Sequence, residues 1–166
     1  NPLDIRLQVV VQRDVVIDAT VKKSSAEMDV AIVDLSEPIY DRTPLKLGDS
    51  GSTTEAQKVY ALGFPQAAEL AQDINYYTNA DVTVTDGIVA KKVEVNGTPF
   101  LQHSAKLSGG NSGGPLLNAD GVVIGINQFR TNGDEYYYAM EINDIKKLLD
   151  AIGVTYSSTE GSQIPP

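Results

Sequence analysis

Apolar and polar residues alternate along the first part of the chain, which predicts β-strands with one buried face. Ile17, Ala19 and Val21 are separated by single polar residues, and this period of two is that of a half-buried strand. Residues 9–12 and 15–23 flank a short polar pair, so together they predict a hairpin.

The same signal continues through the rest of the chain. Asn96-Gly97 lies between two short apolar runs and favours a type I′ turn between two strands. Further strands are predicted at residues 30–35, 58–62, 82–85, 88–95 and 122–128.

One helix is predicted near the end of the chain. Apolar residues recur at helical spacing from 145 to 152, Asn143 is suited to cap the helix and Gly153 to stop it. Residues 157–166 are small, polar and proline-ended, which is typical of a flexible tail or linker. Many short strands followed by one helix favour an antiparallel barrel.

Composition excludes several classes of function. The net charge of −9 argues against a nucleic-acid partner, which requires clustered Lys and Arg. The chain has no cysteine, so disulfides and thiolate metal sites are excluded. This fits a cytosolic protein and equally a bacterial secreted protein that folds without disulfides.

The stretch Gly109-Gly110-Asn111-Ser112-Gly113-Gly114-Pro115-Leu116 carries the strongest chemical signal. Glycines on both sides of Ser112 allow a sharp turn that leaves the hydroxyl uncovered. They also allow the N–H groups of Gly110 and Ser112 to point into a common space that could hold an oxyanion. A glycine-rich turn between strands is the plain structural alternative.

Together with its surroundings, this stretch resembles the nucleophile region of HtrA/Deg-like trypsin-fold serine proteases. Other segments resemble the same family in the same order, namely Met28-Asp29-Val30-Ala31-Ile32-Val33, residues 44–50, residues 59–65 and Tyr138-Ala139-Met140-Glu141-Ile142. The resemblance covers most of residues 28–152.

The resemblance implies a role for each matching residue. Ser112 would attack the scissile carbonyl, Asp29 would orient a histidine, and the Gly110-Asn111-Ser112 backbone would form the oxyanion hole. No metal or cofactor is implied, and the partner would be a polypeptide substrate.

The resemblance also implies where that polypeptide binds. Gly125-Ile126-Asn127 would be the strand edge that pairs with it, and Leu107, Ser108 and Asn127 would border the primary specificity pocket.

The implied fold is all-β, a trypsin-like double β-barrel with a C-terminal helix. Residues 1–55 would form an incomplete N-terminal barrel, residues 56–156 a complete barrel with the closing helix, and residues 157–166 the tail. In the resembled family a PDZ domain often follows, so we expect a further domain or a membrane anchor beyond the tail. The expected location is extracellular, cell-surface or periplasmic in a bacterium.

The histidine that such a protease uses as its base is missing from the expected place. The one histidine is His103, nine residues before Ser112, and we interpret it as a strand or pocket-wall residue. A serine without a base is a weak nucleophile, so we expect the chain as given to be inactive. The favoured hypothesis is a serine endopeptidase whose histidine lies upstream of Asn1. The alternatives are a noncatalytic peptide-binding module on the same fold and, less favoured, a structural β-domain.

Overall fold

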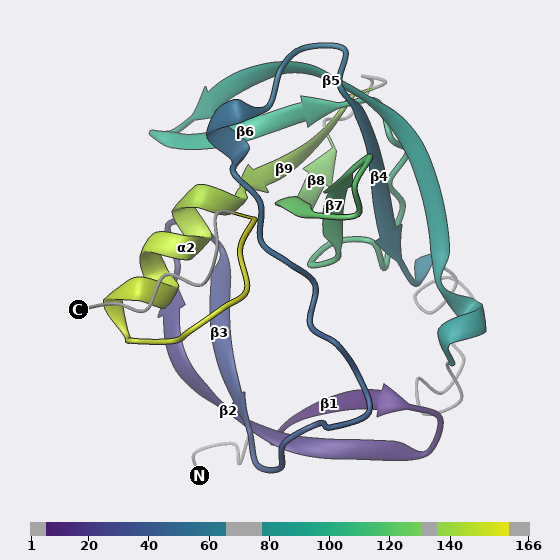
Figure 1. The fold of residues 1–166 in the computed structure, drawn as a ribbon, viewed down its shortest axis with the longest axis vertical. Coiled ribbons are helices and arrows are strands. Elements are labelled where there is room, and N and C mark those ends of the chain that lie inside the picture. The colour runs from purple at the N-terminus through teal and green to yellow at the C-terminus, as the bar shows by residue number, and fades with distance from the viewer. Residues whose placement is uncertain (1–5, 66–77, 131–135, 160–166) are drawn as a thin grey trace, which may run out of the picture.

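The computed structural model describes residues 6–65, 78–130 and 136–159, and its strands form two separate sheets (Figure 1). The first sheet is open and antiparallel, in the order β1-β2-β3, with β1 at Leu7–Gln12, β2 at Val15–Ser25 and β3 at Val30–Leu35. The second is a closed barrel in the order β4-β5-β6-β9-β8-β7. Its strands are β4 (Lys58–Gly63), β5 (Thr83–Val95), β6 (Thr98–His103), β7 (Pro115–Asn118), β8 (Val123–Arg130) and β9 (Tyr137–Glu141). The predicted all-β fold with one C-terminal helix is confirmed.

Two predicted hairpins are present, and their turns have the expected backbone. Asp14 has a φ of 60° between β1 and β2. Asn96 and Gly97 have φ values of 51° and 82° between β5 and β6, which are the two positive angles that a type I′ turn requires.

The barrel encloses the hydrophobic core. Val59, Ala61, Leu101, Leu116 and Ala139 are 0 % exposed, and they come from four of its six strands. Closure leaves every barrel strand with a partner on both sides, so its backbone groups are paired and its inward-facing apolar residues are covered, while Val84 and Ile88 on β5 face outward, 58 % and 45 % exposed.

The β1–β3 sheet is covered much less. Val21 is 57 % exposed, and Leu7, Val16 and Val33 also expose more than a third of their surface. Within the described residues, β1 and β3 each pair only with β2. The sheet therefore has two open edges and uncovered apolar side chains.

Leu47 lies in the segment between β3 and β4 and forms backbone hydrogen bonds with residues that are distant in sequence. Leu47 N–H donates to Ser157 O, Thr159 N–H donates to Leu47 O, and Leu47 also forms a parallel bridge with Val123. The sequence predicts a flexible tail or linker from residue 157. Residues 157–159 instead pair with the segment around Leu47, whose backbone N–H and carbonyl groups both bond to them. The rest of the predicted tail, residues 160–166, lies outside the described residues.

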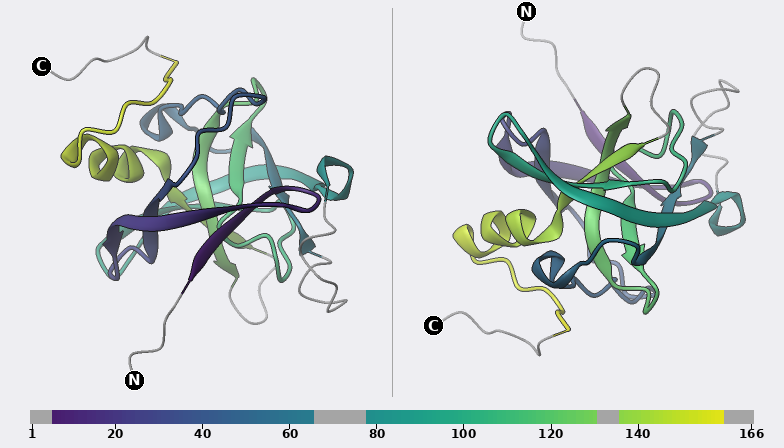
Figure 2. Two further views of the ribbon diagram at one scale, coloured as in Figure 1. Left: turned by 90° about the horizontal axis from the view of Figure 1, so that it is seen from below. Right: turned by 90° about the horizontal axis from the view of Figure 1, so that it is seen from above.

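The helix α2 runs from Ile142 to Ala151, with Glu141 at its N-cap position, and it lies beside the barrel (Figures 1 and 2). The prediction that Asn143 caps the helix is wrong. Asn143 lies inside the first turn and bonds to Asp49 and Ser50. Gly153 has a φ of 68° and ends the helix as predicted. Among the described residues, no helix combines the length and apolar character needed to cross a bilayer.

Candidate active site

The loop around Ser112 packs against the end of β4 so closely that two of its glycines have no room for a side chain. Gly110 has a φ of 97°, and a Cβ there would overlap the carbonyl oxygen of Phe64. A Cβ on Gly114 would overlap the carbonyl oxygen of Leu62. The glycine pattern that singled out this stretch thus reflects close backbone approach as well as a turn.

Hydrogen bonds also fix the loop to β8. Gly113 N–H donates to Asn127 O at 2.7 Å, and Asn127 N–H donates to Gly114 O at 2.9 Å. Ser112 is exposed, and its Oγ donates to the carbonyl oxygen of Gln128 at 2.7 Å. The hydroxyl therefore stands at the surface on a backbone held at several points.

The amides of this loop fall into two groups. The N–H groups of Asn111, Gly113 and Gly114 donate to carbonyl oxygens. Those of Gly110 and Ser112 donate to none in the described part of the chain, so they remain available to an oxyanion. The Asn111 side chain is buried, 2 % exposed, and fills the space next to Gly63.

Asp29 lies in the turn between β2 and β3, where it is exposed and has a φ of 52°. The preceding residue ties this turn to the Ser112 site, because Gln128 Nε2 donates to Met28 O at 2.7 Å. Gln128 thus bonds to Ser112 through its carbonyl oxygen and to the Asp29 turn through its side chain. The positive φ also fits the alternative that Asp29 is a turn residue.

His103 lies inside the barrel, as the last residue of β6, which confirms that it is a strand residue. It is 0 % exposed, and its ring nitrogens have no hydrogen-bond partner among the described residues. Burial lowers its pKa from 6.5 to about 4, while the Asn127 side chain and the Ala105 backbone oppose that shift. A fully buried ring cannot meet the exposed Ser112 hydroxyl, so His103 does not serve as its base.

The three residues expected to border the specificity pocket differ in how deeply they are buried. Leu107 is 4 % exposed and packs in the barrel core, while Ser108 is half-buried and its carbonyl accepts from Asn111 N–H. Asn127 is fully buried, and its Nδ2 donates to Pro115 O at 3.1 Å.

The prediction that Gly125-Ile126-Asn127 is a free strand edge is wrong. These residues pair with β9 on one side and with β7 or the Ser112 loop on the other. β7 begins at Pro115, opposite Ile126. Among the described residues, the stretch of β8 without a strand on that side therefore begins at Gln128. The sequence does not single out Gln128, because the alternation of apolar and polar residues breaks at Asn127-Gln128 and the pairing with β9 is irregular between Asn127 and Phe129.

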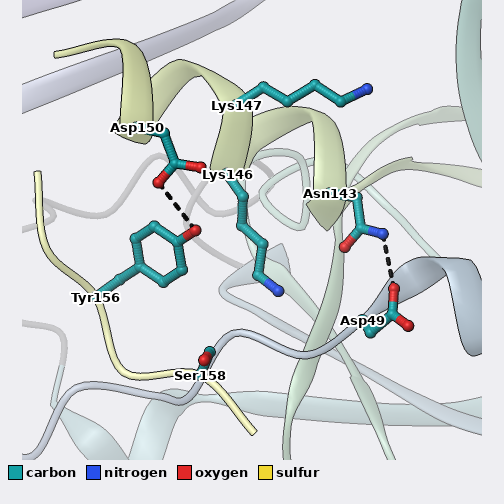
Figure 3. A pocket seen from close by; sticks show the side chains of 7 residues that line it. All are labelled: Asp49, Asn143, Lys146, Lys147, Asp150, Tyr156 and Ser158. Atoms are coloured by element: carbon teal, nitrogen blue, oxygen red, sulfur yellow. Dashed lines mark hydrogen bonds between the residues drawn. The ribbon is translucent and has the colours of Figure 1, made fainter. Parts of the chain in front are cut away.

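A separate polar pocket of about 290 Å³ lies beside α2 and contains none of the predicted site residues (Figure 3). Asn143 Nδ2 donates to Asp49 Oδ1 at 2.7 Å, and Tyr156 Oη donates to Asp150 Oδ1 at 3.1 Å. The Asn143 bond lowers the pKa of Asp49, and burial raises the pKa of Tyr156. These bonds attach the segment before the barrel, and the residues after α2, to the helix. In the described ranges, no three His, Asp or Glu side chains gather as a metal site would require.

Comparison with known proteins gives concordant results. The family profile described as "Trypsin-like peptidase domain" matches residues 4–126. The chain is 28 % identical over 134 residues to "Serine protease Do-like HtrA" of Bacillus subtilis (strain 168), covering 78 % of this chain and 29 % of that protein. It is 35 % identical over 133 residues to "Serine protease HTR4" of Bos taurus, covering 75 % and 25 %. The chain therefore spans under a third of the length of these relatives.

A solved structure shares the fold. The structure titled "HtrA-type protease AlgW with decapeptide" superposes with a TM-score of 0.69 at 23 % identity, covering 82 % of this chain and 41 % of that one. At this identity the likeness establishes the fold alone.

Proposed function

Because this chain belongs to the trypsin-like peptidase domain family and is of the HtrA/Deg type, we propose that it contributes the nucleophile and the orienting acid of a serine endopeptidase. The observation that carries the proposal is the Ser112 loop. It combines an exposed hydroxyl, hydrogen bonds to β8, and the N–H groups of Gly110 and Ser112, which have no partner within the part of the chain that the structure describes.

In the proposed reaction, Ser112 Oγ attacks the carbonyl carbon of the scissile peptide bond, and its proton passes to a histidine base. The Gly110 and Ser112 N–H groups stabilise the tetrahedral oxyanion. Asp29 orients the imidazole and stabilises its protonated form. The intermediate collapses as the C–N bond breaks, and the protonated histidine gives its proton to the leaving amine. Water, deprotonated by the same histidine, then hydrolyses the acyl-enzyme and returns the proton to Ser112, with no metal or cofactor proposed.

The substrate is proposed to be an extended polypeptide that lies along β8. The strand is open on one side from Gln128, so a peptide can add there by main-chain hydrogen bonding. The peptide would then run past the Ser112 hydroxyl, which is bonded to the Gln128 carbonyl. Because the peptide would bond to main-chain groups, Gln128→Ala should weaken peptide binding less than Phe129→Pro, which removes a backbone N–H donor from β8.

The base is proposed to come from chain upstream of Asn1. His103 is buried in the barrel, so the reaction needs another histidine. The open edges of β1 and β3 and the uncovered valines support this proposal, because strands upstream of Asn1 could pair with those edges and cover that face. The family's triad order implies a histidine roughly 30 to 40 residues before Asp29, at the end of a strand.

Labelling with a fluorophosphonate probe tests this proposal. The 166-residue chain should not react, because Ser112 lacks a base. A longer chain that includes the upstream histidine should label at Ser112 and cleave casein, and Ser112→Ala should abolish both. A coding sequence with no histidine upstream of Asn1 would contradict the proposal.

A second candidate is a noncatalytic peptide-binding module. The burial of the only histidine and the bond from Ser112 Oγ to a backbone carbonyl favour it. In that case peptides bind along β8 from Gln128, and Ser112→Ala leaves their affinity unchanged in both the short and the longer chain.

A further inference from the structure

A small pocket of about 250 Å³ lies where the β2–β3 turn, the β5–β6 turn and α2 come together. Met28, Pro99 and Leu148 give it half-buried apolar walls. Ligand pockets for whole small molecules commonly span about 300–1,000 Å³. This volume therefore suits one or two side chains of a peptide better than a large ligand.

Charges at the edge of this pocket are unbalanced. Lys147 Nζ is paired with Asp144 Oδ1 at 2.6 Å. Glu27 is exposed and forms no ion pair or hydrogen bond within the described residues. One carboxylate is thus left for a cation beside the apolar walls.

Met28 connects this pocket with the Ser112 site. Its carbonyl oxygen accepts from Gln128 Nε2, and the Gln128 carbonyl oxygen accepts from Ser112 Oγ, both at 2.7 Å. The Met28 side chain also packs against the barrel cluster that contains Phe100 and Met140. A ligand that contacts Met28 therefore contacts the residue before Asp29 and lies two hydrogen bonds from Ser112.

We propose that this pocket is an effector site for a peptide segment that carries an aliphatic side chain next to a basic one. The aliphatic group packs on Met28, Pro99 and Leu148, and the basic group pairs with Glu27. The bound segment holds the β2–β3 turn in place, so that Met28 keeps its bond to Gln128 and the next residue, Asp29, is held with it. The effector role rests on the proposed protease function, whereas the binding itself does not.

Titration of the 166-residue chain with acetyl-Leu-Arg-amide, followed by amide NMR, tests the binding. Amide shifts are expected at Gly97, Thr98 and Lys147, together with a shift of the Gln128 side-chain amide that reports the connection. Acetyl-Leu-Glu-amide is the matched ligand and should bind more weakly. Equal binding of the two, or shifts confined to other surfaces, would overturn the proposal.

Three variants sharpen the titration. Glu27→Gln lies in an exposed turn and should weaken acetyl-Leu-Arg-amide about two- to fivefold, as expected for loss of one exposed ion pair. Leu148→Ala should weaken both dipeptides, and Glu55→Gln, an exposed acid that does not line the pocket, should weaken neither. An unchanged affinity in Glu27→Gln refutes the cation site even if Leu148→Ala fails to fold.

The longer chain separates this inference from the proposed function. If it fails to label at Ser112 while the dipeptide still binds the short chain as described, the protease proposal fails and the binding site stands. If it is active, acetyl-Leu-Arg-amide should raise its rate of casein cleavage at least twofold, and Glu27→Gln should remove that rise. An active longer chain with no such rise refutes the effector role.

Discussion

The barrel of β4–β9 and the sheet of β1–β3 are both antiparallel, but among the described residues only the barrel encloses a cluster of buried apolar side chains. Leu101 in the barrel is 0 % exposed, while Val21 in the sheet is 57 % exposed. Ser112 belongs to the closed region, and Asp29 belongs to the open one. The proposed nucleophile is therefore held by the barrel, whereas the proposed orienting acid depends on a sheet whose two outer strands each pair on one side only among the described residues.

The largest expected effect concerns Asp29, because it tests whether the open sheet contributes to chemistry. In the longer chain, Asp29→Asn should slow acylation by about 10⁴, the loss expected when a triad histidine is no longer held in the right tautomer. Acylation is measured by the rate of fluorophosphonate labelling. Asp34→Asn, an exposed acid on β3 of the same sheet, is the control. Equal rates for the two variants would make Asp29 only a turn residue.

The next effect compares the stability of the two regions. Leu101→Ala in the barrel should lower the free energy of unfolding by about 2–5 kcal/mol, through lost burial and the cavity left behind. Val21→Ala on the open sheet should change it by no more than about 0.5 kcal/mol. Urea denaturation of the 166-residue chain measures both. A large loss for Val21→Ala would mean that the sheet is covered in solution.

The free energy of unfolding should depend on pH because of His103, which is buried inside the barrel. The folded-state pKa of His103 is lowered to about 4 by burial, so the folded chain binds fewer protons than the unfolded chain between this value and 6.5. The stabilisation is fully present above pH 6.5 and is lost as the pH falls towards 4, by roughly 3 kcal/mol in all. Urea midpoints across this range should fall more steeply for the unmodified chain than for His103→Gln. Parallel curves would show that His103 is not held neutral.

The smallest effect concerns the hydrogen bonds that join α2 to the segment between the sheet and the barrel. Asn143→Ala removes the bonds to Asp49 and Ser50 and should cost about 1 kcal/mol. It should also raise the pKa of Asp49, since the Asn143 bond is the main cause that lowers it. NMR titration of the Asp49 carboxyl group measures this. An unchanged pKa would show that the bond is not formed in solution.

Local sequence signals predicted the local structure well. The β1–β2 hairpin, the Asn96-Gly97 turn and the Gly153 helix stop depend on neighbouring residues only, and all three are present. The Ser112 loop could also be located in the sequence, because Gly110 and Gly113 have positive φ values that favour glycine.

What could not be predicted depends on contacts between residues that are far apart in sequence. The sequence places the substrate-pairing edge at Gly125-Ile126-Asn127, because it carries no signal for the pairing of these residues with β7 and the Ser112 loop, which depends on how the barrel closes. Asn143 has a side chain typical of a helix cap, yet the residues that it bonds to lie more than 90 positions away in the sequence. The pairing of residues 157–159 with Leu47 likewise has no local signal.

That last pairing has a mechanical consequence. Leu47 lies between Ser158 on one side and Val123, the first residue of β8, on the other. A pulling force applied beyond Thr159 would first load the two hydrogen bonds to Leu47 and would then reach β8 through Val123. β8 also carries Gln128, so tension at this end of the chain would pass through these two sets of backbone hydrogen bonds to the strand that holds the Ser112 hydroxyl.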